Sequence, residues 1–201
     1  MFPLEVVLFP GAPLPLHIFE DRYKEMMAFV MAGKTEFGVV LAREKGILNV
    51  GCTATVEQVV KRYDDGRMDI LAAGRRRFEI IVLNEEKPYL QAQVQLFDDE
   101  DTTIAPLETR ESAVNSCREL RALLEEPAAD PALTDPRLSF ALARALPDLD
   151  FRQVLLRSKS EAERITMLAE HLPSYVSRLR YVNQAKQLAP RNGHAKKAKI
   201  D

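Results

Sequence analysis

Two cysteines, Cys52 and Cys117, are the residues most able to act as covalent nucleophiles. A catalytic cysteine needs a base within hydrogen-bond reach, most often histidine, and the histidines are His17, His171 and His194. They fall in a proline-rich segment, at a helix end and near the last residue, with no sign that they converge on a thiol. A pair of Cys52 with His17, assembled in space, stays open, although a small residue of inner strand parity usually belongs to the core. No G-x-S-x-G motif is present, so we predict no catalytic residue and no enzyme activity.

Cofactor and metal motifs are also missing. Residues 28–35 read AFVMAGKT, in which Ala28 replaces the first glycine of a phosphate loop, and Gly33 with Lys34 is more simply a helix end. The acidic residues 98–101 lack the ligand spacing of a calcium loop, and neither cysteine belongs to the CxxC pair typical of zinc sites. We expect no cofactor and no metal, and we interpret residues 98–101 as a solvated linker.

Three consecutive arginines, Arg75, Arg76 and Arg77, could contact phosphate groups. Against this, 28 basic residues face 30 acidic ones, so the net charge is −2. The arginines also lack the interleaved aromatic residues on which RNA bases stack. We expect arginines on the outer face of a sheet, and keep an RNA-binding module as the alternative hypothesis.

The opening segment VVLFPGAPLPLHIFEDRY, residues 6–23, places three prolines among large apolar residues. Proline fixes φ and removes a backbone donor, so we expect a stiff connection that makes few ladder hydrogen bonds. Its apolar side chains either close a core, the more common outcome, or line an exposed groove for peptides. The candidate peptide-binding residues are Leu14, Leu16, Ile18, Phe19 and Tyr23.

The pattern of apolar residues in the first half of the chain predicts strands with one inserted helix. The helix starts near residue 21 and ends near Gly33, because apolar residues recur there at helical spacing. Strands are expected at residues 4–9, 36–43, 52–63, 67–74, 75–83 and 89–97, with a tight hairpin at DDG, residues 64–66. Alternation puts Phe78, Ile80 and Val82, and then Leu90, Ala92, Val94 and Leu96, on the inner face. These strands favour an antiparallel barrel, closed or nearly so.

The second half is predicted to be helical. After the acidic break, helices are expected at residues 107–124, 136–145, 150–157, 160–171 and 173–188, and Ser160 with Glu163 forms a capping box. We predict a β domain at residues 1–100, a helical subdomain at 101–189 and a basic flexible tail at 190–201. No signal peptide and no apolar run of membrane-spanning length is seen, so a cytoplasmic protein without membrane contact is expected.

Several motifs together resemble the N-terminal substrate-recognition domain of Lon-type ATP-dependent proteases, in the short stand-alone form found in bacteria. They are FPLEVVLFPGAPLPLHIFEDRY, FGVVLAR, VGCTATVEQV, DGRMDILAAGRRRFEI and PYLQAQV, in order across residues 2–97. LDFRQVLLRSKSEAERITMLAEHL resembles the helical part of that family more loosely.

The resemblance implies an α+β fold, mainly an antiparallel PUA-like β pseudo-barrel with one inserted helix, followed by a C-terminal helical bundle. It further implies that the protein holds unfolded or client polypeptides rather than cutting them, and that a separate protease or chaperone could receive them. The sequence given contains no ATPase module and no serine-lysine protease domain, so cleavage is not expected. The sequence does not indicate an oligomeric state.

Overall fold

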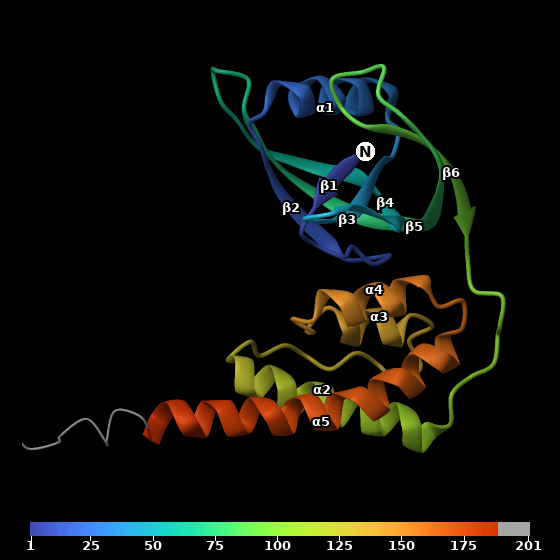
Figure 1. Cartoon of the computed structure of the whole chain (residues 1–201), viewed down its shortest axis with the longest axis vertical. Helices are drawn as coiled ribbons and strands as arrows, with labels where there is room; N and C mark the ends of the chain where they lie inside the picture. Colours follow the sequence, from blue (N-terminus) through green and yellow to red (C-terminus); the bar gives the residue numbers. More distant parts are fainter. Residues whose placement is uncertain (189–201) are drawn as a thin grey trace, which may run out of the picture.

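A computed structural model shows a barrel-like β half stacked on a helical half (Figure 1). Residues 98–106, called the strap below, join the two halves along one side. The structure describes residues 1–188. The β half contains β1 (Phe2–Leu4), β2 (Pro13–Ile18), α1 (Asp21–Gly33), β3 (Phe37–Arg43), β4 (Gly46–Arg62), β5 (Met68–Asn84) and β6 (Gln91–Phe97). The helical half contains α2 (Leu107–Leu124), α3 (Leu138–Ala143), α4 (Leu149–Arg157) and α5 (Glu161–Leu188). The predicted α+β class with a C-terminal helical part is confirmed.

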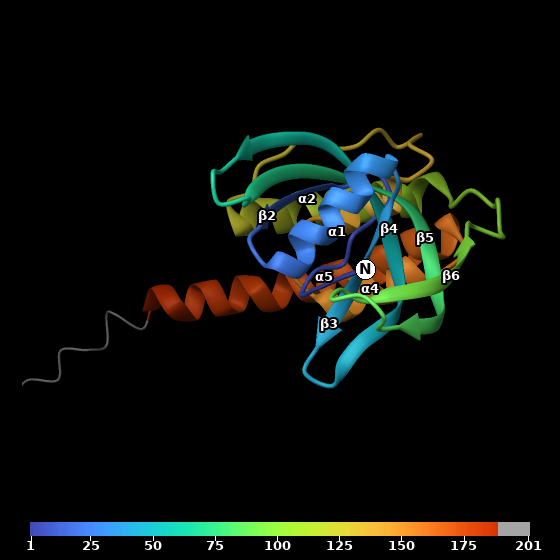
Figure 2. The ribbon, with the colours of Figure 1, turned by 90° about the horizontal axis from the view of Figure 1, so that it is seen from above.

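The six strands form one sheet in the order β1-β3-β4-β5-β2, and β6 pairs with β5 beyond the point where β2 ends. Only β1 with β3 is a parallel pair. β4 and β5 are 17 residues each and are joined by the predicted hairpin at residues 64–66. Register shifts along both strands bend them, so that the first part of β5 pairs with β2 and its last part with β6. Seen from above, the strands curve over the helices (Figure 2).

The proline-rich segment is a strand, which corrects two expectations. Residues 4–9 are not one strand, because β1 ends at Leu4; the predicted stiff connection is instead β2, which pairs antiparallel with β5 from Pro13 to Ile18. Proline is tolerated in a sheet where its missing N–H faces away from the neighbouring strand. β2 has a neighbour on one side only, and Pro13 and Pro15 share one parity. The prolines therefore suit an edge strand and blunt its free edge.

The turn before β2 fits tightly against β5. Gly11 N donates to Gly74 O and Gly74 N donates to Ala12 O, both at 2.9 Å. A Cβ at Gly74 would lie 2.2 Å from the carbonyl oxygen of Phe9. The chain therefore needs glycine here for a close backbone approach rather than for an unusual φ.

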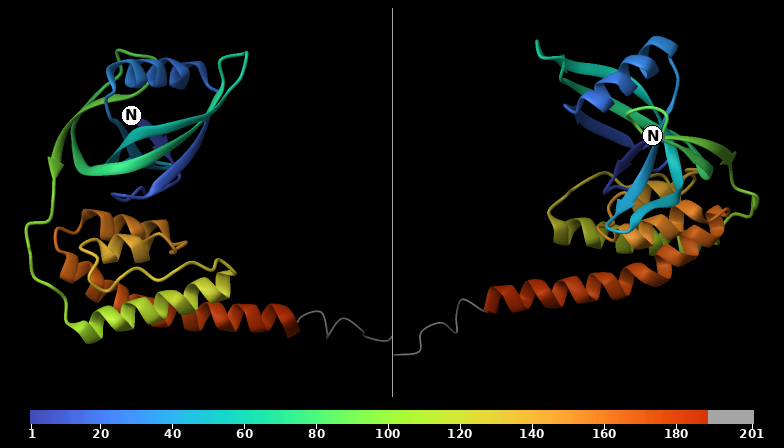
Figure 3. Two further views of the ribbon diagram at one scale, coloured as in Figure 1. Left: turned by 180° about the vertical axis from the view of Figure 1, so that it is seen from behind. Right: turned by 45° about the horizontal axis from the view of Figure 1, so that its top comes forward.

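The buried apolar side chains form one connected cluster that runs through both halves. Phe9 of the β half stacks on Phe140 of α3 at a centroid distance of 5.2 Å. From α4, Arg152 donates to Val7 O at 2.7 Å and Gln153 donates to Val50 O at 2.8 Å. The underside of the barrel therefore packs directly on α3 and α4 (Figure 3).

The helices were predicted at the right places, with one error. Residues 160–171 and 173–188 are a single helix, α5, with Pro173 inside it. Leu172 and Val176 on either side of the proline are both buried, and the long α2–α5 contact keeps the helix continuous through the lost hydrogen bond. The predicted tail at residues 190–201 lies outside the described residues.

Candidate polypeptide-binding surfaces

The structure divides the predicted peptide-binding set between core and surface. Leu14, Ile18 and Tyr23 are buried, Leu16 is half-buried, and Phe19 alone is well exposed, at 58%. Leu14, Leu16 and Ile18 alternate with the outward-facing residues of β2, so they close the barrel. Of the five, Phe19 is the residue available to a ligand.

Phe19 adjoins a polar cluster on the outer face of the sheet. The ring of His17 stacks on it at 5.8 Å, and His17 Nδ1 lies 2.6 Å from Asp69 Oδ1. The Tyr63 hydroxyl donates to the other oxygen of Asp69 at 2.8 Å. Hydrogen bonds from His17 and then Tyr63 hold the pKa of Asp69 below its usual range. His17 is thus occupied by a carboxylate, not by a thiol.

Cys52 is a core residue and not a nucleophile. It has no exposed surface, and its thiol donates to the carbonyl of Thr53 at 3.3 Å. Burial raises the pKa of Cys52 to about 12, so the thiolate is not populated near neutral pH. The hypothetical Cys52–His17 pair is not formed.

The arginine run is neutralised by ion pairs. Arg75 pairs with Glu57, and Arg76 pairs with Glu36 at 3.0 Å. The expectation that all three arginines face outward is wrong for Arg77, which is 3% exposed and pairs with Asp99 at 2.6 Å. A phosphate ligand would have to displace these carboxylates.

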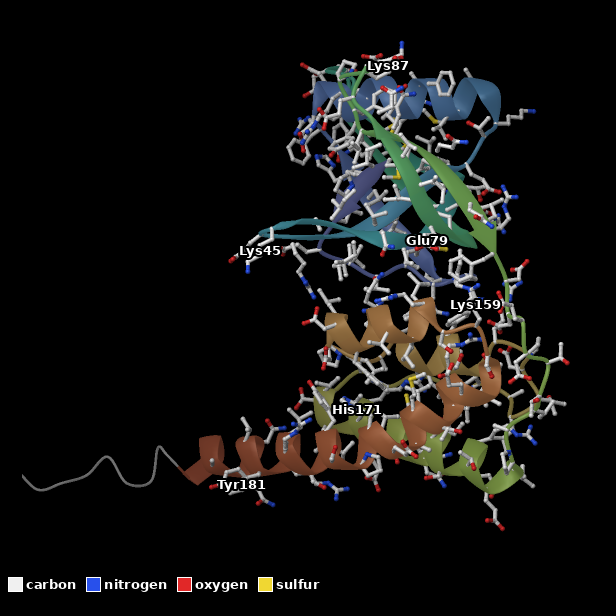
Figure 4. The ribbon with its side chains drawn as sticks, turned by 45° about the vertical axis from the view of Figure 1, so that its right-hand side comes forward. Lys45, Glu79, Lys87, Lys159, His171 and Tyr181 are labelled. Carbon is white, nitrogen blue, oxygen red and sulfur yellow. The ribbon has the colours of Figure 1, made fainter. Side chains whose placement is uncertain are left out.

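The acidic residues 98–101 belong to the linker between β6 and α2 and three of the four are exposed, but Asp99, Glu100 and Asp101 also hold the strap in place. Asp99 accepts hydrogen bonds from Arg164 at 2.6 and 2.7 Å as well as from Arg77. The Ser160 hydroxyl donates to Asp101 at 2.7 Å, and Glu100 pairs with Lys159 at 2.5 Å. Figure 4 shows Lys159 at the level where the two halves meet.

The two arginines of this ion cluster, Arg77 and Arg164, are almost fully buried. Arg164 is 1% exposed and also pairs with Glu161 at 2.7 Å. Its Nε donates a hydrogen bond to the Ser139 hydroxyl at 2.8 Å. Burial tends to raise the pKa of Asp99, but the hydrogen bonds and charges of Arg164 and Arg77 outweigh it and hold that pKa below its usual value. The cluster therefore joins strap, barrel and α5 as one electrostatic unit.

An apolar groove lies on the barrel between α1 and β6. Its volume is about 220 Å³, and Phe29 on its rim is 65% exposed. Figure 4 shows Lys87, in the loop between β5 and β6, close to α1. The apolar and aromatic lining comes from Met1, Met26, Phe29, Val30, Phe37, Phe78, Tyr89, Ala92 and Val94.

The groove runs beside an open strand edge. Within residues 1–188, β6 pairs with β5 alone, so its other edge presents unpaired backbone groups. Gln91, Ala92 and Val94 of that strand are themselves part of the groove lining. Sequence analysis assigned these residues to a strand and Phe29 to a helix, but no local signal indicated that the two would meet.

The ribbon made by β5 and β6 carries exposed apolar side chains on both of its faces. Ile81, Val82, Leu83 and Leu96 are 54%, 54%, 45% and 41% exposed. The predicted inner position of Val82 is therefore wrong, whereas Leu96 pairs with the buried Phe78 and lies on the same face as Val94, at the exposed end of the ribbon. A register shift between Ile80 and Val82 changes which side chains face inward.

In residues 1–188 no three His, Cys, Asp or Glu side chains come together in a way that could hold a metal ion. Among the helices of the same residues, none combines the length and apolar character needed to cross a membrane.

A sequence model of the ATP-dependent protease La (Lon) substrate-binding domain matches residues 1–179. The chain belongs to the Lon substrate-binding domain family. This confirms the resemblance seen in the sequence.

Its relatives include Lon protease 1 of Hydrogenovibrio crunogenus, which is 30% identical over 107 residues, and a Lon protease of Anaeromyxobacter dehalogenans, which is 27% identical over 126 residues. These matches cover 48% and 59% of this chain but only 13% and 15% of the relatives. The chain therefore spans only a small part of the curated proteases it matches.

Two solved structures share the fold. The Lon N-terminal domain protein from Xanthomonas campestris superposes with a TM-score of 0.67 at 23% identity, covering 85% of this chain and 95% of that one. The N-terminal domain of a Mycobacterium avium complex Lon protease gives 0.62 at 16% identity, covering 86% and 96%. At these identities the likeness establishes the fold alone.

Proposed function

We propose that this protein binds extended or unfolded polypeptide segments and does not cleave them. The observation that carries the proposal is the apolar α1–β6 groove beside the open edge of β6. Membership of a substrate-binding family supports it. RNA binding is the weaker alternative, because Arg75, Arg76 and Arg77 are each paired with a carboxylate.

The proposed mechanism is strand addition combined with apolar burial. An extended segment would hydrogen-bond to the free backbone groups of β6, and every second side chain would enter the groove. Backbone pairing is independent of sequence, so many unfolded segments would fit, and the groove would favour those with large apolar residues. Ordering a flexible chain offsets part of the gain, so a single segment would bind with modest affinity.

The protein would act as a receptor that presents clients to a separate protease or chaperone, with residues 1–100 as the binding domain and residues 101–189 as its helical support. Both cysteines are free and buried, which suits a reducing compartment such as the cytoplasm.

The test is binding of a fluorescent, reduced and carboxymethylated protein, with its native form as control, at low and high salt. Phe29→Asp places a charge on the groove rim, and Phe19→Asp is the matched control because Phe19 is equally an exposed phenylalanine but lies outside the groove lining. Burying one such side chain contributes about 1.5–3 kcal/mol, so Phe29→Asp should weaken binding about tenfold or more.

Salt-resistant binding to the unfolded form alone, lost in Phe29→Asp and kept in Phe19→Asp, supports the proposal. If Phe19→Asp is the variant that loses binding, the site is the segment around β2 instead. Binding that disappears at high salt would mean that the contact is electrostatic, which contradicts apolar burial in the groove.

A further inference from the structure

The free edge of β6 differs from the other edges of the sheet. β1 is three residues long and contains Pro3, and β2 contains Pro13 and Pro15, so both have features that keep an edge strand from pairing. β6 is seven residues long and contains no proline and no charged residue. Figure 1 and Figure 3 both show it at the side of the β half. In the part of the chain that the structure describes, β6 is therefore the long edge strand without protection against pairing.

The side chains of β6 make the strand complementary to itself. Ala92, Val94 and Leu96 share one face, and Gln93 and Gln95 are exposed on the other. A two-fold axis perpendicular to the sheet pairs β6 antiparallel with β6 of a second copy and keeps the two faces apart. Apolar side chains then meet apolar side chains, and glutamine meets glutamine. Because a glutamine amide both donates and accepts hydrogen bonds, this contact involves no repulsion between like charges.

One register uses the whole strand. With the axis at Val94, the side chain of Val94 meets its own counterpart in the second copy. Ala92 then lies opposite Leu96 of the second copy, and Gln93 lies opposite Gln95. All seven residues of β6 have a partner in this register, and no charged side chain of the strand is involved.

The same register covers apolar side chains that are exposed in a single copy. Within one chain, Leu96 pairs with the buried Phe78 of β5, and Ala92 pairs with Leu83 of β5. Joining the two sheets gives one apolar row across four strands, made of Phe78 and Leu96 from one copy and Ala92 and Leu83 from the other. Leu96 is 41% and Leu83 is 45% exposed in the single chain. The pairing therefore removes apolar surface from water in addition to satisfying the backbone of β6.

We propose that β6 pairs antiparallel with β6 of a second copy about Val94, and that this dimer closes the edge to clients. The proposal rests on the proposed function for the role of that edge and adds a second occupant that competes for it. A client that adds a strand to β6 has to separate the two copies, so the dimer is the closed form of the receptor. One strand pair forms a small interface, which indicates a transient dimer with a dissociation constant on the order of 10 µM.

The test is sedimentation velocity of the wild type from about 1 to about 200 µM, a range that brackets the expected dissociation constant. One double variant, Gln93→Lys with Gln95→Lys, places lysines opposite each other across the axis. A second, Gln93→Glu with Gln95→Glu, does the same with glutamates. Both side chains are exposed, so the fold is retained. Like charges directly opposite are unfavourable, so the dissociation constant of each double variant should rise about tenfold.

An equal mixture of the lysine and glutamate variants should form the dimer again, because lysine then lies opposite glutamate. Gln58→Lys is the control, since Gln58 is also an exposed glutamine but lies on β4, which has neighbours on both sides. It should dimerise as the wild type does. A wild type that stays monomeric over the whole range, double variants that dimerise as tightly as the wild type, or a mixture that stays monomeric would each overturn the proposal.

Addition of the carboxymethylated protein should dissociate the wild-type dimer, and both double variants should bind that protein because their edge is free. Binding that leaves the dimer intact would overturn the competition. If the wild type is monomeric and still binds the carboxymethylated protein, only the present inference fails. If the dimer and its recovery in the mixture are found but neither the wild type nor the double variants bind, the proposed function fails and the dimer stands.

Discussion

Replacing Asp99 by asparagine should destabilise the whole protein, because Asp99 holds two nearly buried arginines together. Its carboxylate accepts hydrogen bonds of 2.6–2.7 Å from Arg77 and Arg164, which are 3% and 1% exposed. Asparagine keeps the shape but removes the charge, which leaves Glu161 as the only acidic partner of Arg164 in the described ion pairs. Breaking such a pair costs about 3–5 kcal/mol. Since Asp99 is 27% exposed, we expect the lower end, about 3 kcal/mol.

The assay is urea unfolding followed by far-UV circular dichroism, which suits a chain without tryptophan. The matched control is Glu57→Gln, which removes one carboxylate from the pair with Arg75, where both side chains are 44% exposed. Exposed pairs contribute little, so this control should leave the midpoint unchanged. A loss in Asp99→Asn no larger than that of the control would refute the reasoning.

The pH dependence gives a second check of the same idea. The pKa of Asp99 is lowered in the folded protein, so its stabilising effect is complete above the ordinary aspartate pKa of about 3.9 and disappears as the pH falls through the folded value. The difference in unfolding free energy between wild type and Asp99→Asn should therefore shrink on acidification below about pH 4. A difference that stays constant to low pH would mean that the lost stability is not electrostatic.

Three other predictions concern different parts of the molecule. Cys52 and Cys117 should resist a thiol reagent at neutral pH in the native protein and react fully in denaturant, because burial raises the pKa of both. Replacing Arg75 and Arg76 together by alanine should not change retention on an RNA column, since both are paired; a large drop in retention would revive the RNA alternative. Gly74→Ala should abolish soluble expression or lower the melting temperature by about 6–12 °C, the effect of a loss of about 3 kcal/mol in a chain of this size, because the added Cβ would lie 2.2 Å from a carbonyl oxygen.

Local patterns in the sequence were enough to predict most of the elements. The apolar spacing that predicted a helix after residue 21 gave α1 nearly to the residue, and the DDG turn gave the β4–β5 hairpin. The sequence left open whether Leu14, Leu16 and Ile18 close the core or line a groove, and their alternation along β2 decides for the core. These signals work because each depends on neighbours only a few residues away.

The predictions that failed needed a partner far along the chain. The alternation of side chains along the strand predicted that Arg77 points to solvent. Register shifts bend β5 instead, and Arg77 hydrogen-bonds to Asp99 and to the carbonyl oxygens of Leu156 and Ser158. Pro173 predicted the end of one helix and the start of another, because proline removes a helical hydrogen bond. The packing of α5 on α2, which the local sequence does not show, keeps the helix continuous. The candidate surfaces fall in the same class, because each is formed where segments distant in sequence meet. No spacing in a single segment could have indicated Phe29 beside β6.

The α1–β6 groove lies on the part of the barrel that faces away from the helices (Figure 1). The ion cluster of Asp99 with Arg77 and Arg164 instead lies where the strap meets the helical half. A segment bound in the groove therefore need not disturb that cluster, although its binding to the folded state raises the melting temperature by mass action. Asp99→Asn should accordingly bind the carboxymethylated protein as the wild type does at a temperature where both are folded, and a loss of binding as large as that of Phe29→Asp would contradict this separation.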